Sequence, residues 1–304
     1  MGIRLYREPE LEKPILIAGW PGIGNVGIAA VDTLRDQLQA EEFGEIEPWD
    51  FFYPNKVTIK DGLLGDLEFP TNKFYYKRLE KKDLIFFIGE EQPSGRGMLY
   101  AEGEKAHEMA NLILDVAEKF GCKRVFTSGA CVSLIHHKAK PRVISVVSSQ
   151  KLKAEVKEYP NTILISEIET RGSGGVITGL NGLLLTVAKK RGLQGICLMG
   201  EVPDWFSGAP LPYPEASKSV LEVFADVLGI RIDFNVLDEM ALEVEGIIEE
   251  LYEKFPLEIR ERYDRRKVIA QAEAKAISEE DAQWIKEHID EFFKKDKENG
   301  DQAI

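Results

Sequence analysis

Short apolar runs alternate with amphipathic stretches along the first three-quarters of the chain. The apolar runs predict strands at residues 14–19, 84–88, 124–128, 143–147, 162–166 and 195–199. Many of them are apolar throughout, which is typical of strands that are covered on both faces. The stretches between them predict helices at 26–39, 101–119, 179–191 and 214–228. This alternation predicts an α/β fold, in which helices flank both faces of a mostly parallel sheet.

Residues 48–78 interrupt the alternation. They are rich in aromatic residues and contain paired short apolar runs separated by turn residues. Such a segment is typical of a β-hairpin, and we expect it to be inserted at one edge of the sheet.

The composition changes after about residue 232, which divides the chain into an α/β domain at 1–232 and an acidic helical extension at 233–304. Residues 234–304 contain 20 Asp and Glu against 11 Lys and Arg. The first predicted helix of the extension carries a stripe of apolar residues three to four positions apart. These residues are Leu237, Met240, Val244, Ile247, Leu251 and Phe255.

Pro256 ends this first helix, and two more helices are predicted after it. The second contains a basic cluster (Arg260, Arg262, Arg265, Arg266 and Lys267), which we expect to be solvated because acidic residues surround it. The third begins at Ser278, where Asp281 three positions later resembles a capping box. The apolar stripe has two interpretations: it packs against the α/β domain of its own chain, or it pairs with the same helix of another subunit.

Charge and hydropathy exclude two classes of partner. The chain has 304 residues and a formal net charge of −13, whereas a nucleic-acid surface needs clustered positive charge. No stretch approaches the roughly 18 consecutive apolar residues of a membrane span, and the N-terminus lacks a signal-peptide pattern. We therefore expect a cytoplasmic protein that binds neither nucleic acid nor membrane. Three widely spaced cysteines, Cys122, Cys131 and Cys197, are expected to be mainly buried hydrophobic residues in a reducing compartment.

The segment Gly22-Ile23-Gly24-Asn25-Val26-Gly27 formally matches the dinucleotide-binding pattern G-x-G-x-x-G. That fingerprint also requires a second strand about 20 residues later, ending in an acid that binds a ribose hydroxyl. Residues 41–50 contain many acids, but no apolar strand is predicted before them. The glycines still permit positive φ angles and a close backbone approach, and the amides at the helix start offer a place for an anion.

Other catalytic and cofactor motifs do not fit the chain. No Lys-Ser/Thr pair follows the glycines, so a P-loop is excluded. Residues His136 and His137 are adjacent and would point to opposite faces of a strand, and no HExxH or paired Cys/His spacing is present. The segment 128–132 is not a nucleophile elbow and is expected to be a strand end followed by a turn. We expect no metal and no cofactor.

Carboxylates at predicted strand ends are the better candidates for catalysis. Glu90 and Glu91 follow the strand at 84–88, and Glu201 follows the strand at 195–199. Ligands of an open parallel sheet bind outside the carboxyl ends of its strands. The other residues expected at this rim are Gly22, Gly24, Asn25, Gly27, Gly129, Gly174 and Asn181. Such a rim forms either a ligand pocket or an assembly surface, and both alternatives stay open.

The same strand ends carry a series of motifs. They are "GWPGIGNVG" (19–27), "IGEEQPSG" (88–95), "TSGA" (127–130), "GVITGLNGLLL" (175–185), "LPYPEAS" (211–217) and "LGI" (228–230). Their order and spacing over residues 14–232 resemble the proteasome assembly chaperone 2 family, and the first and fourth motifs are the most specific. The resemblance indicates that the glycine-rich turn is of the family type and is not a dinucleotide fingerprint.

The resemblance implies an α/β fold similar to the phosphorylase/hydrolase-like class. Eukaryotic members pair as chaperones of proteasome α-rings, and archaeal relatives form homo-oligomers that bind proteasome-related partners. Chaperoning members use a tail ending in hydrophobic-Tyr-any, whereas this chain ends in Gln302-Ala303-Ile304, so this tail function is not implied. Some relatives carry an ATP-grasp-type ligase label, for which the chain shows no nucleotide–Mg²⁺ residues.

Two hypotheses about function result. The first is a non-enzymatic, chaperone-like protein that acts by homo-oligomerisation and protein contacts, with proteasome α-subunits or related assemblies as partners. The second is a protein that binds a small molecule, such as a nucleotide, or a ligase- or hydrolase-type enzyme. Its site would lie at the rim formed by residues 22–27, Glu90, Gly129, 172–175 and Glu201.

Overall fold

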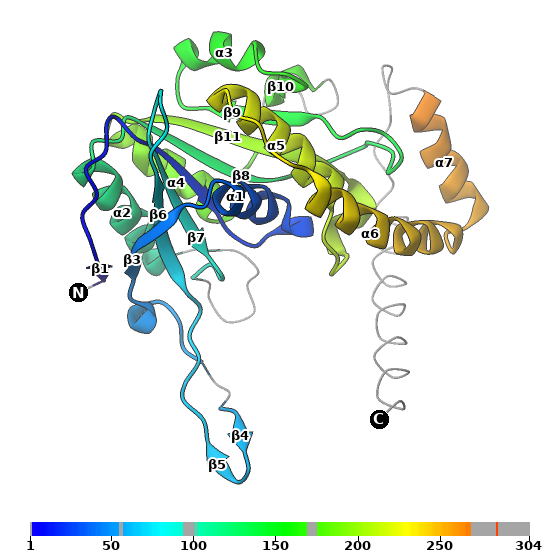
Figure 1. Cartoon of the computed structure of the whole chain (residues 1–304). Helices are drawn as coiled ribbons and strands as arrows, with labels where there is room; N and C mark the ends of the chain where they lie inside the picture. Colours follow the sequence, from blue (N-terminus) through cyan, green and yellow to red (C-terminus); the bar gives the residue numbers. More distant parts are fainter. Residues whose placement is uncertain are drawn as a thin grey trace.

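A mixed sheet of nine strands forms the centre of the molecule in the computed structural model, which describes residues 2–54, 57–93, 101, 103–168, 175–268 and 284 (Figure 1). Across the sheet the strands are β1 (Ile3–Leu5), β3 (Glu41–Ile46), β6 (Asn72–Lys77), β7 (Leu84–Gly89), β2 (Ile15–Gly19), β8 (Arg124–Ser133), β11 (Gln194–Pro203), β9 (Val143–Val147) and β10 (Thr162–Leu164). The central strands β7, β2, β8 and β11 are parallel, and β6 and β9 join them through antiparallel pairs. The predicted α/β fold with a mostly parallel sheet is confirmed.

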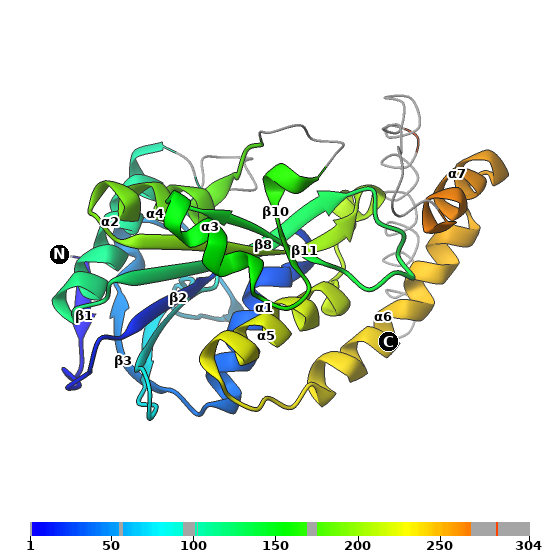
Figure 2. The ribbon, with the colours of Figure 1, turned by 90° about the horizontal axis from the view of Figure 1, so that it is seen from above.

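Helices cover both faces of this sheet (Figure 2). Two of them, α2 (Gly103–Lys119) and α4 (Gly179–Lys190), pack together on one face, while α1 (Val26–Gln37) and α5 (Pro214–Leu228) pack on the other. The short helix α3 (Gln150–Lys157) lies beside β9 and β10 (Figure 1). The chain then continues from α5 into α6 (Asn235–Glu253) and α7 (Leu257–Val268).

The two helical layers explain why the central strands are apolar throughout. In β2, Ile15 and Ile17 belong to the core beneath α1 and α5, while Leu16 and Ala18 belong to the core beneath α2 and α4. Successive side chains of a strand point to opposite faces, so a strand with helices on both sides buries every position.

Several regions differ from the sequence-based expectations, among them β1, which was not predicted. Strand β8 continues through residues 128–132, so the expected turn in this segment was wrong, because β11 pairs with β8 along its whole length. Residues 41–46 form β3, which the sequence analysis did not predict, because EEFGEI contains only two large apolar residues and no regular alternation. The helix α3 was also not predicted.

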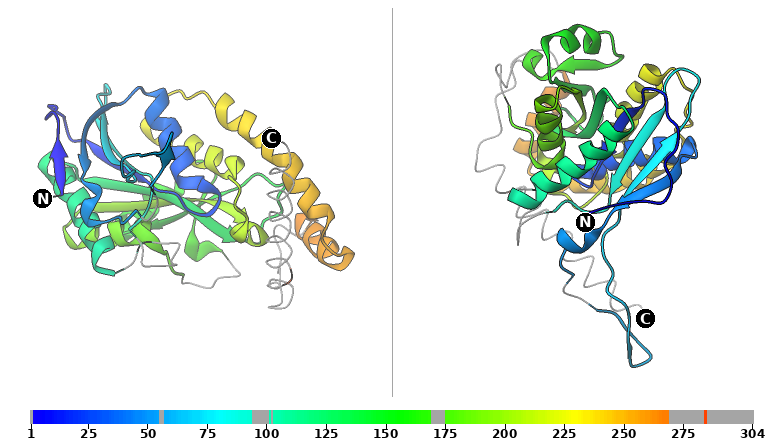
Figure 3. Two further views of the ribbon diagram at one scale, coloured as in Figure 1. Left: turned by 90° about the horizontal axis from the view of Figure 1, so that it is seen from below. Right: turned by 90° about the vertical axis from the view of Figure 1, so that its left-hand side faces the viewer.

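The predicted hairpin within residues 48–78 is present, but only its second part joins the sheet. Residues 72–77 form β6, which pairs with β3 and β7 near one side of the sheet. Between β3 and β6 in the sequence, β4 (Ile59–Lys60) and β5 (Leu63–Leu64) form a separate two-stranded hairpin. This hairpin projects away from the sheet in both views that show it from the side (Figures 1 and 3).

The apolar stripe of α6 faces the α/β domain of its own chain. Leu237, Val244 and Phe255 are buried in the same core cluster as residues of α1 and α5. The stripe was expected to include Ile247, but the neighbouring Ile248 is the more deeply buried of the two. This packing favours the intramolecular interpretation of the stripe. The predicted third helix from Ser278 lies outside the described residues, apart from Trp284. Gly174, which was expected at the rim, also lies outside them.

Candidate functional site

The carboxyl ends of the central strands meet at one rim of the sheet, as expected, and a cavity of about 210 Å³ lies there. Its walls come from residues 20–23 with Gly27, from Gln92, from 129–132 near the end of β8, and from Ile165, 176–178, Asn181 and Met199. None of these described lining residues is charged. The rim therefore forms a small, neutral cavity.

The glycine-rich turn between β2 and α1 is shaped by packing. Gly24 and Asn25 have φ angles of 58° and 48°, in the left-handed region that glycine and asparagine adopt most easily. The backbone amide of Tyr213 donates a hydrogen bond to the Gly24 carbonyl at 2.8 Å, and a Cβ on Gly24 would lie 2.8 Å from the Tyr213 Cβ. The turn therefore holds the start of α1 against the loop that leads into α5.

Gly27 allows α1 to approach β8 closely. A Cβ at this position would lie 2.1 Å from the Ser128 carbonyl oxygen, which is far inside van der Waals contact. Gly22 differs from it, since it is exposed and a Cβ added there would meet no heavy atom within 4 Å. Of these three glycines, close packing thus requires Gly24 and Gly27 and leaves Gly22 unconstrained.

The position of β3 excludes the dinucleotide arrangement. In that fingerprint, the strand after the first helix pairs with the first strand and brings its acid to the ribose. Here β2 pairs with β7 and β8, and β3 lies on the far side of β6 and β7. The acids of β3 are therefore separated from the glycine-rich turn by two strands.

Gln92 connects three segments at the rim, a role that the sequence analysis missed. Its side-chain amide donates to the Pro21 carbonyl at 2.9 Å, and its Oε1 accepts hydrogen bonds from the backbone amides of Leu180 at 3.0 Å and Ala101 at 3.4 Å. It thus joins the β2 turn to the first turn of α4 and to a residue just before α2. The motif "IGEEQPSG" contains this residue and was the available signal.

Asn181 and Gly129 face each other across the cavity wall. A Cβ on Gly129 would lie 2.8 Å from the Asn181 side-chain nitrogen. The Oδ1 atom of Asn181 is buried and has no hydrogen-bond partner among the described residues. These two predicted site residues are therefore brought together with Gly22 and Gly27 around one cavity.

The three predicted strand-end carboxylates, Glu90, Glu91 and Glu201, do not line this cavity. Glu201 is completely buried within β11 and forms a bidentate ion pair with Arg142, at 2.8 Å for both contacts. The backbone amide of Arg142 also donates to Glu201 Oε2, at 3.1 Å. Glu90 is exposed and accepts a hydrogen bond from the Thr71 backbone amide at 2.7 Å. Glu90 and Glu201 thus hold neighbouring chain segments in place.

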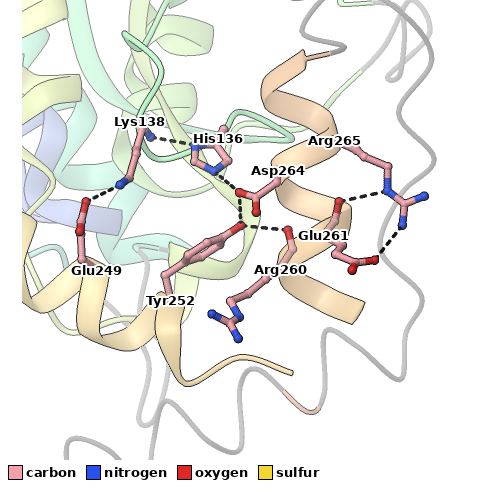
Figure 4. A network of polar contacts seen from close by, with 8 residues as sticks. All are labelled: His136, Lys138, Glu249, Tyr252, Arg260, Glu261, Asp264 and Arg265. Atoms are coloured by element: carbon pink, nitrogen blue, oxygen red, sulfur yellow. Dashed lines mark hydrogen bonds and ion pairs between the residues drawn. The ribbon is translucent and has the colours of Figure 1, made fainter. Parts of the chain in front are cut away.

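A second polar cluster joins the β8–β9 loop to the C-terminal helices (Figure 4). His136 Nε2 lies 3.3 Å from Asp264 Oδ1, and the Tyr252 hydroxyl lies 2.9 Å from the same oxygen. Lys138 pairs with Glu249 of α6 at 2.6 Å. We call the His136, His137, Lys138, Glu249, Tyr252 and Asp264 group the latch, because it fastens α6 and α7 to the α/β domain.

His137 occupies the centre of the latch. Its ring stacks on His136 with 4.3 Å between the ring centroids and lies 4.5 Å from the Tyr252 ring. Burial lowers the pKa of His137 from 6.5 to about 4, and the neighbouring His136 and Lys138 act in the same direction. These two histidines are not on a strand, because β8 ends at Ser133, and their rings stack in the loop that follows it.

The cysteines behave as the sequence analysis expected. All three are buried, and burial raises the pKa of Cys122 and of Cys197 to about 12. Thiols with a raised pKa are inert at neutral pH. Among the described residues, no group of three or more His, Cys, Asp or Glu side chains is placed to hold a metal ion. No described helix is long and apolar enough to cross a membrane.

Several known archaeal proteins are similar to this chain. The chain is 33% identical over 279 residues to the uncharacterised protein MJ1210 of Methanocaldococcus jannaschii, covering 90% of this chain and 93% of that protein. PbaB of Pyrococcus furiosus, an archaeal proteasome activator, has a crystal structure that matches with a TM-score of 0.67 and 30% identity, covering 82% of this chain and 97% of PbaB.

A second crystal structure, PbaA of the same organism, is described as an archaeal homologue of proteasome-assembly chaperone. It matches with a TM-score of 0.60 and 23% identity, covering 90% of this chain and all of PbaA. The model of the PAC2 family matches residues 16–252, which include the whole rim and most of the first helix of the extension. The chain therefore belongs to the PAC2 family.

Proposed function

We propose that this protein is a non-enzymatic, chaperone-like member of its family. It acts as a homo-oligomer in the cytoplasm and binds proteasome α-subunits or a related assembly. The observation that carries the proposal is the 30% identity to the proteasome activator PbaB across 97% of that chain. Likeness over a whole domain at this level supports a similar mode of action more strongly than a shared fold does.

The rim geometry supports the non-enzymatic part of the proposal. An enzyme at this rim needs a titratable group in reach of a bound substrate. None of the three candidate carboxylates, Glu90, Glu91 and Glu201, lines the cavity. Glu90 accepts a hydrogen bond from the Thr71 backbone amide instead, and Glu201 pairs with Arg142.

Size-exclusion chromatography with light scattering tests the proposal. The purified chain is mixed with archaeal proteasome α-subunits and, separately, with assembled core particles. We expect co-elution with at least one of them, together with a change in the rate of core-particle assembly or of peptide hydrolysis. Co-elution with neither at tens of micromolar would contradict the partner, while a monomeric mass of the chain alone would contradict homo-oligomerisation.

The unpaired Oδ1 of Asn181 favours a second candidate function, the binding of a small neutral ligand at the rim. A buried acceptor without a donor costs free energy, which a ligand N–H or O–H would recover. Native mass spectrometry of the purified chain tests this candidate. A molecule bound at about one per chain and lost in Asn181→Leu supports it, and identical bare masses of both proteins contradict it.

A further inference from the structure

Exposed apolar side chains are concentrated in one short segment. Of the twelve large hydrophobic side chains that are exposed among the described residues, seven lie between residues 49 and 67. They are Trp49, Tyr53, Val57, Ile59, Leu63, Leu64 and Leu67, with exposed fractions from 44% at Val57 to 78% at Leu64. Scattered exposed hydrophobic residues are ordinary, whereas seven of them in one short segment are typical of an interaction surface.

This segment forms a preshaped arm, which we define as residues 57–67 with Trp49 and Tyr53 at its base. Asp61 and Gly62 have φ angles of 52° and 77°, as a two-residue type I′ hairpin turn requires. At the base, the Trp49 ring packs edge-on against Phe69 at 4.5 Å between centroids, while Phe51 and Phe52 are buried in the domain core. The arm is therefore anchored at its base and projects from the sheet (Figures 1 and 3).

The two strands of the arm pair only with each other among the described residues, and no third strand supports them. Strand β4 pairs only with β5 in the described structure, so both outer edges of the hairpin are open. Ile59 and Leu64 are directly opposite each other and share one face, and Leu63 lies on the other face opposite Lys60. An isolated two-stranded hairpin is marginally stable in water, and open apolar edges promote pairing with another chain.

We propose that the arm is the contact through which two copies of this chain associate, arm against arm about a two-fold axis. A two-fold contact requires one self-complementary surface, and the arm supplies it with apolar residues on both faces and two open strand edges. This proposal rests on the homo-oligomer of the proposed function and names the segment that forms it.

The area of the arm is consistent with this pairing. An aliphatic side chain buries roughly 60–120 Å² and an aromatic one about 150–250 Å². Weighted by their exposed fractions, the seven side chains present roughly 500 Å² per copy, or about 1,000 Å² for two arms together. This approaches the lower limit of stable interfaces, and the strand edges and the base add to it.

The experiment compares the native mass of four proteins by light scattering. Two variants place like charges on one face of the arm: Ile59→Lys with Leu64→Lys, and Ile59→Glu with Leu64→Glu. The matched control is Leu242→Lys on α6, where the side chain is 72% exposed, similar to the 71% of Ile59. All substituted positions are exposed, so circular dichroism and thermal unfolding are expected to match the wild type.

We expect a wild-type mass of at least twice the 34.3 kDa of one chain, half of that mass for each charged arm variant, and no change in the control. Mixing the lysine and glutamate variants is expected to restore the wild-type mass, and high salt to abolish this rescue. Arm variants that keep the wild-type mass would overturn the arm contact and leave the homo-oligomer intact. Dissociation of both variants without rescue in the mixture would overturn arm-to-arm pairing. A monomeric wild type would overturn both proposals.

Discussion

At the residue scale, a single missing methyl group sets the distance between α1 and the sheet. The Gly27 Cα lies so close to β8 that a Cβ would be 2.1 Å from the Ser128 carbonyl oxygen and 2.4 Å from its carbon. Both are backbone atoms of a central strand, paired on both sides with β2 and β11, so they cannot move aside without disturbing the sheet.

We therefore expect Gly27→Ala to lower the free energy of unfolding by about 1–3 kcal/mol or more, because the helix has to shift away from β8. Urea denaturation measures this. The matched control is Gly22→Ala in the same turn, where the backbone is extended (φ −168°) and the space around a Cβ is open. Equal effects of both substitutions would show that α1 does not rest on β8 as described.

The Glu201–Arg142 pair is the second feature that depends on individual atoms. Glu201 is fully buried and accepts three hydrogen bonds from Arg142, two of them from the guanidinium. Removing one member of such a pair leaves the other without its counter-charge.

Glu201→Gln is expected to lower the free energy of unfolding by about 1–3 kcal/mol. This is less than the loss typical of a fully buried ion pair, because the Arg142 side chain is partly exposed and water still solvates it. Urea denaturation again provides the measurement. Glu90→Gln, at the end of β7 and separated from β11 by two strands, is the control. A change within about 0.5 kcal/mol is expected there because this side chain is exposed. A loss of small-molecule binding by Glu201→Gln without any loss of stability would instead support the rim-carboxylate hypothesis.

At the element scale, the latch connects α6 and α7 to the β8–β9 loop of the domain. His137 has its ring nitrogens buried without hydrogen-bond partners in the described structure, so its charged form is disfavoured. The groups facing it are His136 and Lys138, which lower its pKa, and Glu249 and Asp264, which raise it less. The net result is a pKa of about 4 in the folded protein against 6.5 ordinarily.

This difference predicts a loss of stability in acid. Below pH 6.5 the unfolded chain takes up a proton at His137, whereas the folded chain does so only near pH 4, so the free energy of unfolding falls as the pH drops between these values. We expect a contribution on the order of 2 kcal/mol, less than the full shift because the ring is only partly enclosed.

Urea titrations from pH 7.5 to about pH 4 measure this contribution. The variant His137→Phe keeps an aromatic ring against Tyr252 but cannot titrate, so its stability is expected to decline less steeply over the same interval. Parallel pH profiles of the wild type and the variant would show that His137 is not the group responsible.

At the scale of the whole molecule, the extension covers part of the α/β domain. The apolar residues of α6 and α7 share one core cluster with Trp205, Phe206 and Tyr213 of the domain. Trp205 also lies edge-on against Phe255, with 5.4 Å between the ring centroids. The proposed division at residue 232 therefore separates two parts that bury a joint apolar surface.

A chain ending after Ile232 is accordingly expected to unfold at a lower temperature than the full chain and to bind a hydrophobic dye, because it exposes this surface. A milder perturbation is Ile248→Asp, which places a charge at a position that is 7% exposed, with Leu242→Asp as the exposed control. Equal melting temperatures of the truncated and full chains would contradict the joint core.

Much of the architecture was predictable from local patterns. The strand at 143–147 and the helix at 214–228 were predicted at their observed bounds. A continuous apolar run indicates a strand that is buried on both faces, and amphipathic periodicity indicates a helix that is buried on one face. Strand β3 was missed because a half-exposed strand beside the sheet edge needs few apolar residues, and its sequence EEFGEI shows little of the expected pattern.

The site was predictable only in part. The motifs predicted that Gly22, Gly27, Gly129 and Asn181 lie at one rim, because the carboxyl ends of parallel strands meet at one edge of the sheet. The structure places all four around one cavity there. The motifs did not reveal that Arg142 neutralises Glu201 or that Gln92 joins three segments. Arg142 is 59 residues from Glu201, and Pro21 and Leu180 are 71 and 88 residues from Gln92.

By itself, the sequence determined the alternation of buried strands and amphipathic helices, the acidic extension and the family motifs, since each of these is written in neighbouring residues. Only the tertiary structure decided where the β3 acids lie relative to the glycine-rich turn, which carboxylates are already paired, and that α6 faces its own domain. It also showed that the apolar residues of the arm face solvent. These outcomes depend on strand order and on contacts between distant segments, which local periodicity does not encode.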